Sequence, residues 1–133
     1  MGEGRRTVLV VDDEEPVRRV LSSKLRREGY DCASAADGKE ALDKVASEHF
    51  DVVLLDIKMP GMSGMQALPR IVAESPNTCV IMSTAVVDVQ TALEALNLGA
   101  CDFITKPFDL DDVAGRVDRA LEAKGLMQQR QAR

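Results

Sequence analysis

Five polar side chains of this 133-residue chain share one feature: each stands at the end of a short apolar run. They are Asp12, Asp13, Asp56, Thr84 and Lys106. Taken singly, each has an ordinary explanation, such as a helix cap for Asp13, a turn for Asp56 or a solvated lysine for Lys106. If the runs are parallel strands, however, their carboxyl ends meet at one edge of a sheet, where ligand sites form. The pattern therefore predicts one polar site built from all five residues.

The residue types at this edge indicate metal-assisted phosphoryl chemistry. Three neighbouring carboxylates raise one another's pKa, and a hard divalent cation such as Mg²⁺ relieves that repulsion. A carboxylate beside a metal ion can attack a phosphoryl group and form an acyl phosphate. A lysine and a hydroxyl then neutralise the phosphoryl oxygens, which suits Lys106 and Thr84. Asp56 ends the middle strand of the acidic set and is the best acceptor candidate.

The elements that must position these side chains alternate along the chain. Apolar, β-branched runs predict five strands, and helical spacing of apolar residues predicts a helix after each. In the fourth of these helices, residues 88–98, we expect Val89, Ala92, Leu93 and Leu96 to face inward. This alternation predicts an α/β fold, a three-layer sandwich with a five-stranded parallel sheet covered on both faces. The predicted strands are Thr7–Val11, Tyr30–Ala36, Val52–Leu55, Cys79–Met82 and Asp102–Thr105.

Local signals mark where two of the helices begin. Asp37 is expected to cap the second helix. Ser63 and Gln66 have the spacing of a capping box, which starts the third helix near Gly64. Pro69 then falls inside that helix, where its missing N–H removes a backbone hydrogen bond, so we expect a kink.

Four motifs give the chain a likeness to a known family. They are residues 8–14 (VLVVDDE), 53–61 (VLLDIKMPG), 83–85 (STA) and 106–108 (KPF). On these motifs the sequence resembles the receiver domain of bacterial two-component response regulators, over nearly the whole chain. The resemblance implies a flavodoxin-like (βα)5 fold with strand order 2-1-3-4-5. It also implies a domain at residues 7–124, after an extension at 1–6 and before a polar tail or linker at 125–133.

The resemblance assigns the central chemistry to four residues. Asp56 would accept the phosphoryl group from the phosphohistidine of a histidine kinase. Mg²⁺ would be held by Asp12, Asp13, Asp56 and the backbone carbonyl of Lys58.

The same resemblance implies a switch around the phosphoryl site. Thr84 would hydrogen-bond a phosphoryl oxygen, Lys106 would pair with it, and Ala85 would keep the pocket open. Gly64 matches the glycine that opens the third helix. Phe103 stands at the switch aromatic, and it is expected to rotate into the space that Thr84 leaves, which changes the surface of the fourth helix, fifth strand and fifth helix.

The partners that follow are a sensor histidine kinase or phosphotransfer protein, an output domain after the tail, and a second copy on phosphorylation. The protein would be a cytoplasmic signalling domain that catalyses only its own phosphorylation and dephosphorylation. With 17 Lys and Arg against 22 Asp and Glu, the net charge is −5. That balance argues against nucleic-acid binding by this domain, and no apolar run is long enough to span a membrane.

Two other functions remain open at this point. An aspartate-nucleophile phosphatase shares the Mg²⁺ and the acyl phosphate, but it usually carries a second aspartate where this chain has Lys58. A degenerate receiver would act as an interaction module without phosphorylation, and it usually lacks one of the acidic or lysine residues present here. Lys58 and Val86 flank the expected path of attacking water, and neither orients water well. We therefore expect slow loss of the phosphoryl group.

The remaining reactive side chains have ordinary interpretations. Cys32, Cys79 and Cys101 lack metal-ligand spacing and are expected to be buried, reduced thiols without a nearby base. His49 is the only histidine and is expected at the surface. The first helix is basic, which fits a solvated face and a kinase-docking surface equally well; its cations are Arg18, Arg19, Lys24, Arg26 and Arg27.

Overall fold

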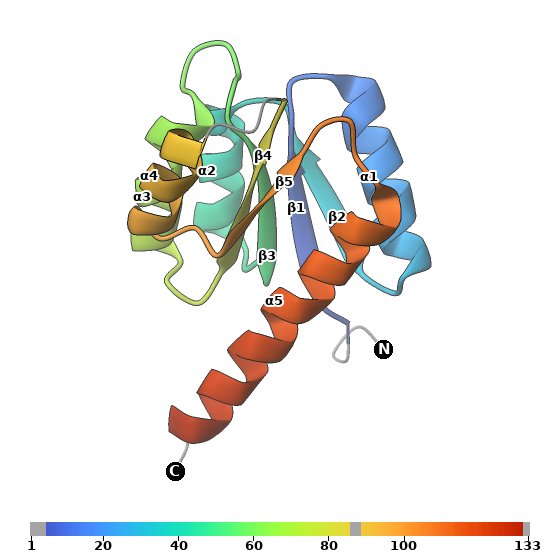
Figure 1. Ribbon diagram of the computed structural model, residues 1–133, viewed down its shortest axis with the longest axis vertical. Helices are drawn as coiled ribbons and strands as arrows, with labels where there is room; N and C mark the ends of the chain where they lie inside the picture. Colours follow the sequence, from blue (N-terminus) through green and yellow to red (C-terminus); the bar gives the residue numbers. More distant parts are fainter. Residues whose placement is uncertain (1–4, 86–88, 132–133) are drawn as a thin grey trace.

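The computed structural model describes residues 5–85 and 89–131, and five strands alternate with five helices within them (Figure 1). The strands are β1 (Thr7–Val11), β2 (Asp31–Ala35), β3 (Val52–Asp56), β4 (Cys79–Thr84) and β5 (Asp102–Thr105). The helices are α1 (Glu15–Arg27), α2 (Gly38–Ser47), α3 (Gly64–Glu74), α4 (Val89–Asn97) and α5 (Leu110–Gln131). The predicted alternation is confirmed.

The strands form one parallel sheet in the order β2-β1-β3-β4-β5. Helices α1 and α5 cover one face, and α2, α3 and α4 cover the other, which gives the predicted three-layer sandwich (Figure 1). β3 and β4 run one and two residues further than the sequence predicts. Asp56 and Thr84 therefore belong to the ladder, with Asp56 opposite Ser83.

The central strands are buried on both faces because the side chains that they present to each face of the sheet are apolar. Alternate residues of β1 point into two separate clusters: Leu9 lies in the cluster under α2, α3 and α4, and Val10 in the one under α1 and α5. Val113 and Val117 of α5 complete the second cluster. This double burial fixes the sheet, and with it the positions of the strand ends.

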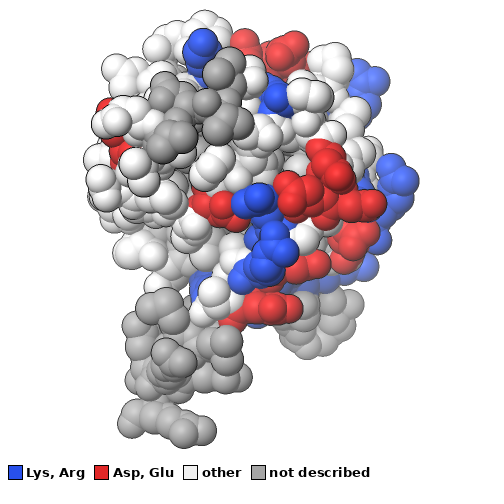
Figure 2. Space-filling model, in the orientation of Figure 1, with Lys and Arg blue, Asp and Glu red and all other residues white. Residues whose placement is uncertain are grey.

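The inward face predicted for α4 is partly wrong. Leu93 and Leu96 are 52% and 41% exposed, whereas Ala95, which was not among the predicted core residues, is 1% exposed. The small Ala95 side chain packs against the core and turns both leucines outward. The side of the molecule around α4 is accordingly poor in charge, while acidic and basic side chains alternate over α1 and α5 (Figure 2). Val89, in the same predicted face, has a side chain outside the described part.

Both predicted helix starts are confirmed. The Asp37 carboxylate accepts the N–H of Glu40. Ser63 and Gln66 form the capping box, and Pro69 lies inside the helix that begins at Gly64. The kink at Pro69 stays a prediction.

Candidate functional site

The polar residues predicted from strand ends meet at the carboxyl edge of the sheet. Asp56 and Thr84 are the last residues of β3 and β4, Asp12 directly follows β1, and Lys106 directly follows β5. The Lys106 N–H donates to the Thr84 carbonyl over 2.8 Å, which continues the β4–β5 pairing beyond the strands. Parallel topology thus places side chains from four strands in one cluster.

Three carboxylates lie together there. Asp12, Asp13 and Asp56 each offer an oxygen, and these oxygens all lie within 4.8 Å of one another. Asp12 and Asp56 are only 1% and 4% exposed, while Asp13 is exposed at the rim. Two buried carboxylates and one accessible carboxylate form an anionic site that is open to solvent on one side.

Lys106 is the cation nearest to the buried carboxylates. Its Nζ donates to Asp12 Oδ2 over 2.9 Å and to Asp56 Oδ2 over 3.4 Å, and it lies 5.9 Å from the centre of the Phe108 ring. Burial by itself would lower the pKa of Lys106. The hydrogen bond that Lys106 donates to Asp12 and the charge of Asp56 outweigh burial and raise that pKa, so the ammonium stays charged.

One lysine does not compensate the acidic group fully. Burial, followed by the neighbouring charge of Asp12, raises the pKa of Asp56 above its ordinary value, against the opposing effect of Lys106. A divalent cation between these oxygens would remove the repulsion, and oxygen-only ligands suit Mg²⁺. The residues present therefore fit a hard cation.

Backbone groups hold the two buried carboxylates in place. Asp12 Oδ1 accepts the N–H of Glu14 over 2.9 Å, and Asp56 Oδ1 accepts the N–H of Lys58 over 3.3 Å. Arg18 Nη1 donates to the Asp12 carbonyl over 2.7 Å. The sequence places Arg18 only on a basic helix face; its role in supporting the Asp12 backbone could not be foreseen, because it depends on where α1 lies over the strand end.

Gly64 meets the strongest steric requirement near the site. A Cβ atom at this position would lie 2.1 Å from the Asp56 carbonyl oxygen, a distance at which real atoms collide. The Gly64 N–H donates to the Ile57 carbonyl over 2.8 Å. Only glycine therefore lets α3 begin directly against the backbone of the central aspartate.

A cavity of about 270 Å³ opens over the carboxylates. Its walls include Asp13, Asp56, Lys58, Thr84 and Lys106, together with the small side chain of Ala85. Phe103 lies outside this cavity. It shares a separate crevice of about 10 Å³ with Thr84, and it is half-buried against the core. Val86 lies outside the described residues.

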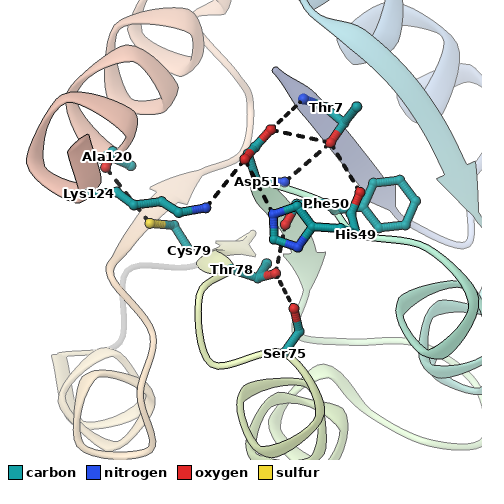
Figure 3. Close-up of polar contacts among 9 residues, drawn as sticks. All are labelled: Thr7, His49, Phe50, Asp51, Ser75, Thr78, Cys79, Ala120 and Lys124. Carbon is teal, nitrogen blue, oxygen red and sulfur yellow. Dashed lines mark hydrogen bonds and ion pairs between the residues drawn. The ribbon is translucent and has the colours of Figure 1, made fainter. Parts of the chain in front are cut away.

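The opposite, amino-terminal edge of the sheet holds a second polar cluster, which sequence reasoning missed (Figure 3). Asp51 Oδ2 accepts the N–H of Thr7 over 2.9 Å, and Asp51 Oδ1 lies 3.3 Å from Lys124 Nζ and 3.4 Å from His49 Nε2. His49 is half exposed, as predicted. Asp51 directly precedes β3, and that position is the only signal in the sequence.

The prediction for the cysteines is wrong with respect to burial. Cys101 is exposed, and Cys32 and Cys79 are half-buried; all three are free. Cys101 lies between α4 and β5, directly before the strand, while Cys79 begins β4 with its Sγ 3.8 Å from the Ala120 carbonyl of α5.

Comparisons with known proteins agree with one another. The family model described as "Response regulator receiver domain" matches residues 8–118. The regulatory protein AtoC of Escherichia coli (strain K12) is 44% identical over 119 residues, which is 90% of this chain and 26% of that protein. Sporulation initiation phosphotransferase F of Bacillus subtilis (strain 168) is 39% identical over 88% of this chain and 94% of that protein.

Among solved structures, a CheY-like response regulator receiver domain protein from Methanospirillum hungatei JF-1 has a TM-score of 0.89 and 29% identity. The match covers 92% of this chain and 98% of that one. The chain spans about a quarter of the length of AtoC and about half the length of the transcriptional regulatory protein YkoG of Bacillus subtilis, 26% and 52% respectively.

Proposed function

This chain belongs to the response regulator receiver domain family, and we propose that Asp56 is the residue on which it accepts a phosphoryl group. The observation that carries the proposal is the convergence of three carboxylates and Lys106 on one accessible cavity. Asp56 is the one of the two buried carboxylates that lines this cavity, and its side chain is 6% exposed. A phosphoryl donor in the cavity would meet Asp56 before Asp12.

The transfer is a displacement at phosphorus. A carboxylate oxygen of Asp56 forms the new P–O bond while the bond from phosphorus to the donor breaks. With a phosphohistidine donor, the leaving imidazole keeps the electron pair of the P–N bond and takes up a proton. The product is an acyl phosphate on Asp56, and the donor histidine returns to its neutral form.

Asp12, Asp13, Asp56 and the backbone carbonyl of Lys58 would hold Mg²⁺. When bound, that ion offsets the charge that gathers on the phosphoryl oxygens. Asp12 is fixed for such a role by the N–H of Glu14, and Asp13 supplies an accessible carboxylate at the rim.

Lys106 and Thr84 supply the remaining contacts to the phosphoryl group. The Lys106 ammonium, already charged and within 3.4 Å of Asp56, would turn from the carboxylate toward a phosphoryl oxygen. The Thr84 hydroxyl stands on the cavity wall and would donate a hydrogen bond to another oxygen. Neither group needs a change of backbone conformation in β4 or β5 to reach the cavity wall.

Thr84 also lines the crevice beside Phe103, which suggests how phosphorylation is transmitted. A crevice of about 10 Å³ holds at most one water molecule, so a phenyl ring cannot enter it while Thr84 stays in place. Movement of Thr84 toward the phosphoryl group would enlarge this crevice and let Phe103 turn inward. The surface of α4, β5 and α5 would then have two states that a partner can distinguish.

Receiver domains are signalling domains whose partner is a kinase or phosphotransfer protein. We propose a sensor histidine kinase in this role and a receiver domain at residues 7–124. The segment from 125 onward, which α5 enters as far as Gln131, is proposed as a polar tail or as the start of a linker to an output domain. A second copy would bind through α4 and α5 after phosphorylation. Nucleic-acid contacts would belong to the output domain, since this chain carries a net charge of −5.

The proposed location is the cytoplasm. Among the residues that the structure describes, no helix is both long and apolar enough to cross a membrane.

The alternatives have less support. A phosphatase of the aspartate-nucleophile class needs an acid–base carboxylate two residues after the nucleophile, where Lys58 stands. A degenerate receiver is disfavoured because the acidic triad and Lys106 are all present in one cluster. Lys58 on the cavity wall would not orient water for attack, so the acyl phosphate is expected to persist.

The test is the intact mass of the chain after incubation with Mg²⁺ and a small-molecule phosphodonor. We expect the wild type to gain one phosphoryl group, and Asp56→Ala and a sample with chelated metal to gain none. Asp51→Ala is a matched control, because it removes a half-buried carboxylate at the other edge of the sheet and should still be phosphorylated. An unchanged wild-type mass, or a mass gain in Asp56→Ala, would overturn the proposal. Slow return to the original mass after donor removal would support persistence.

A further inference from the structure

Two of the three cysteines lie side by side at the amino-terminal edge of the sheet, far from the acidic pocket. Cys79 is the first residue of β4, and Cys101 is the residue just before β5. The N–H of Cys101 donates to the carbonyl of Val80 over 2.8 Å, so Cys101 is paired with the residue that follows Cys79. The two thiols are close enough for each to shift the pKa of the other.

Both thiols line one cavity of about 470 Å³ beneath α5. Three cations, Arg116, Arg119 and Lys124, form part of the same wall. Cys101 is exposed, while Cys79 is covered by α5, with its Sγ 3.8 Å from the Ala120 carbonyl (Figure 3). A reagent in this cavity would therefore reach Cys101 first and find Cys79 directly behind it.

From this placement we propose that Cys101 and Cys79 form a reversible disulfide in response to hydroperoxides, with Cys101 as the attacking thiol and Cys79 as the resolving thiol. The N–H of Cys101 is hydrogen-bonded to Val80, the residue after Cys79, so the two backbones are neighbours, as a disulfide requires. On the cavity wall Lys124 favours the thiolate of Cys101, while Asp102, which is paired with Arg116, opposes it. The proposal does not depend on phosphorylation of Asp56.

The two thiols differ in pKa, as the attacking role of Cys101 and the resolving role of Cys79 require. The interaction with the Cys79 thiol lowers the pKa of Cys101 against the opposing effects of partial burial and of Asp102, and the Val80 backbone and Lys124 add to that lowering. The same interaction, together with burial, raises the pKa of Cys79. Cys101 is therefore the thiol that loses its proton first.

The chemistry balances in two steps. The Cys101 sulfur attacks one oxygen of the hydroperoxide; an S–O bond forms, the O–O bond breaks, and the departing oxygen leaves as water or alcohol. The Cys79 sulfur then attacks the Cys101 sulfur; the S–S bond forms and the S–O bond breaks. The hydroxide that departs takes the Cys79 proton and leaves as water. Two thiols are oxidised by two electrons, and the hydroperoxide is reduced.

Cys32 provides an internal control. It lies on β2, opposite Val8 of β1, and two strands separate β2 from β4. Three strand spacings amount to roughly 14 Å, twice the Cα separation of about 7 Å that a disulfide can bridge. Cys32 therefore cannot pair with either of the others in the folded chain.

The experiment is treatment of the folded wild-type chain with hydrogen peroxide, followed by intact mass, thiol counting and peptide mapping without reduction. We expect loss of two hydrogen atoms, loss of two of the three thiols, and a peptide pair joined through Cys79 and Cys101. A reducing agent should restore the original mass. The Cys32→Ser variant should behave in the same way.

The single variants separate the two roles. In Cys79→Ser, Cys101 should stop at a sulfenic acid that dimedone traps, and in Cys101→Ser oxidation should be at least about tenfold slower. Retention of all three thiols, a linkage that includes Cys32, or a linkage only between two chains would overturn the proposal. Peptide mapping of the wild type decides the linkage even if a serine variant does not fold.

Discussion

The two ends of the sheet each hold a shielded aspartate beside a lysine, and the balance of charge at the two ends is opposite. At the carboxyl edge, Lys106 faces three carboxylates, and burial with the charge of Asp12 raises the pKa of Asp56. At the amino edge, burial alone would raise the pKa of Asp51. The Thr7 N–H and the Lys124 ammonium outweigh it and lower that pKa (Figure 3). At the amino edge, donors of the protein itself compensate the negative charge of Asp51. At the carboxyl edge, the three carboxylates keep an excess of negative charge.

This difference separates a structural contact from a functional one. The Asp51 cluster ties the start of β1 and the C-terminal half of α5 to the start of β3, and its donors come from the protein itself. The acidic pocket lacks enough internal donors, and a cation would make up the difference. An aspartate whose ionised form is destabilised in the folded protein marks a site where binding can be strong.

The largest expected effect on stability comes from removing the Asp51 carboxylate at the amino edge. Asp51→Ala leaves Lys124, whose side chain is 9% exposed, without its carboxylate, and it leaves the Thr7 N–H without its acceptor. We expect the free energy of unfolding at pH 7 to fall by about 2 kcal/mol. Urea denaturation followed by circular dichroism measures the change.

Asp31→Ala is the matched control for that loss. Asp31 also pairs with a cation, Arg5, but the two side chains are 50% and 60% exposed. Removal of this surface pair should change stability by less than about 0.5 kcal/mol. Equal losses in Asp51→Ala and Asp31→Ala would mean that burial does not strengthen the inner cluster.

At the carboxyl edge, removal of the Asp56 charge should raise the free energy of unfolding, opposite to the effect of removing Asp51. Asp56→Asn removes one of two adjacent buried charges and keeps an oxygen that can accept from Lys106. Without divalent cations, we expect a gain in the free energy of unfolding of about 1 kcal/mol. The same urea measurement tests it, with Asp43→Asn, an exposed carboxylate on α2, as the control. A loss of stability in Asp56→Asn would show that the pocket is not electrostatically strained.

The contrast between the edges was only partly predictable from the sequence. Strand ends are marked by the change from apolar to polar residues, and parallel topology then gathers Asp12, Asp13, Asp56 and Lys106 without further information. The pairing of Asp51 with Lys124 joins residues that are 73 positions apart. It depends on the path of α5 across the sheet, which no local pattern specifies.

The errors in α4 and at the cysteines have related physical causes. A short helix with apolar residues on two sides can bury either, and Ala95 packs closer to the sheet than Leu93 or Leu96 could. An apolar thiol next to a strand suggests burial, but Cys101 lines a cavity beneath α5 that leaves it exposed. Close approach and helix placement decide both cases, and neither is a property of the local sequence.

The smallest expected effect is a difference in pH dependence, and it compares the two edges in a single titration. The folded pKa of Asp56 is raised above 3.8, so its ionisation costs stability as pH rises through that pKa, and acidification removes the cost. The folded pKa of Asp51 is lowered below 3.8, so its contribution is complete above 3.8 and is lost as pH falls through the folded pKa.

On acidification from pH 7, the stability gained by Asp56→Asn should therefore begin to shrink as pH falls through the raised folded pKa, and it should be lost once pH is below 3.8. The stability lost in Asp51→Asn should instead persist down to 3.8 and shrink only below that value. Each change should amount to about 1 kcal/mol or less at its end point. Urea denaturation of the wild type and both variants across this pH range measures the two differences. If the stability changes of both variants shrank over the same pH range, the two aspartates would share one electrostatic environment. The distinction between a compensated charge at Asp51 and an uncompensated one at Asp56 would then be wrong.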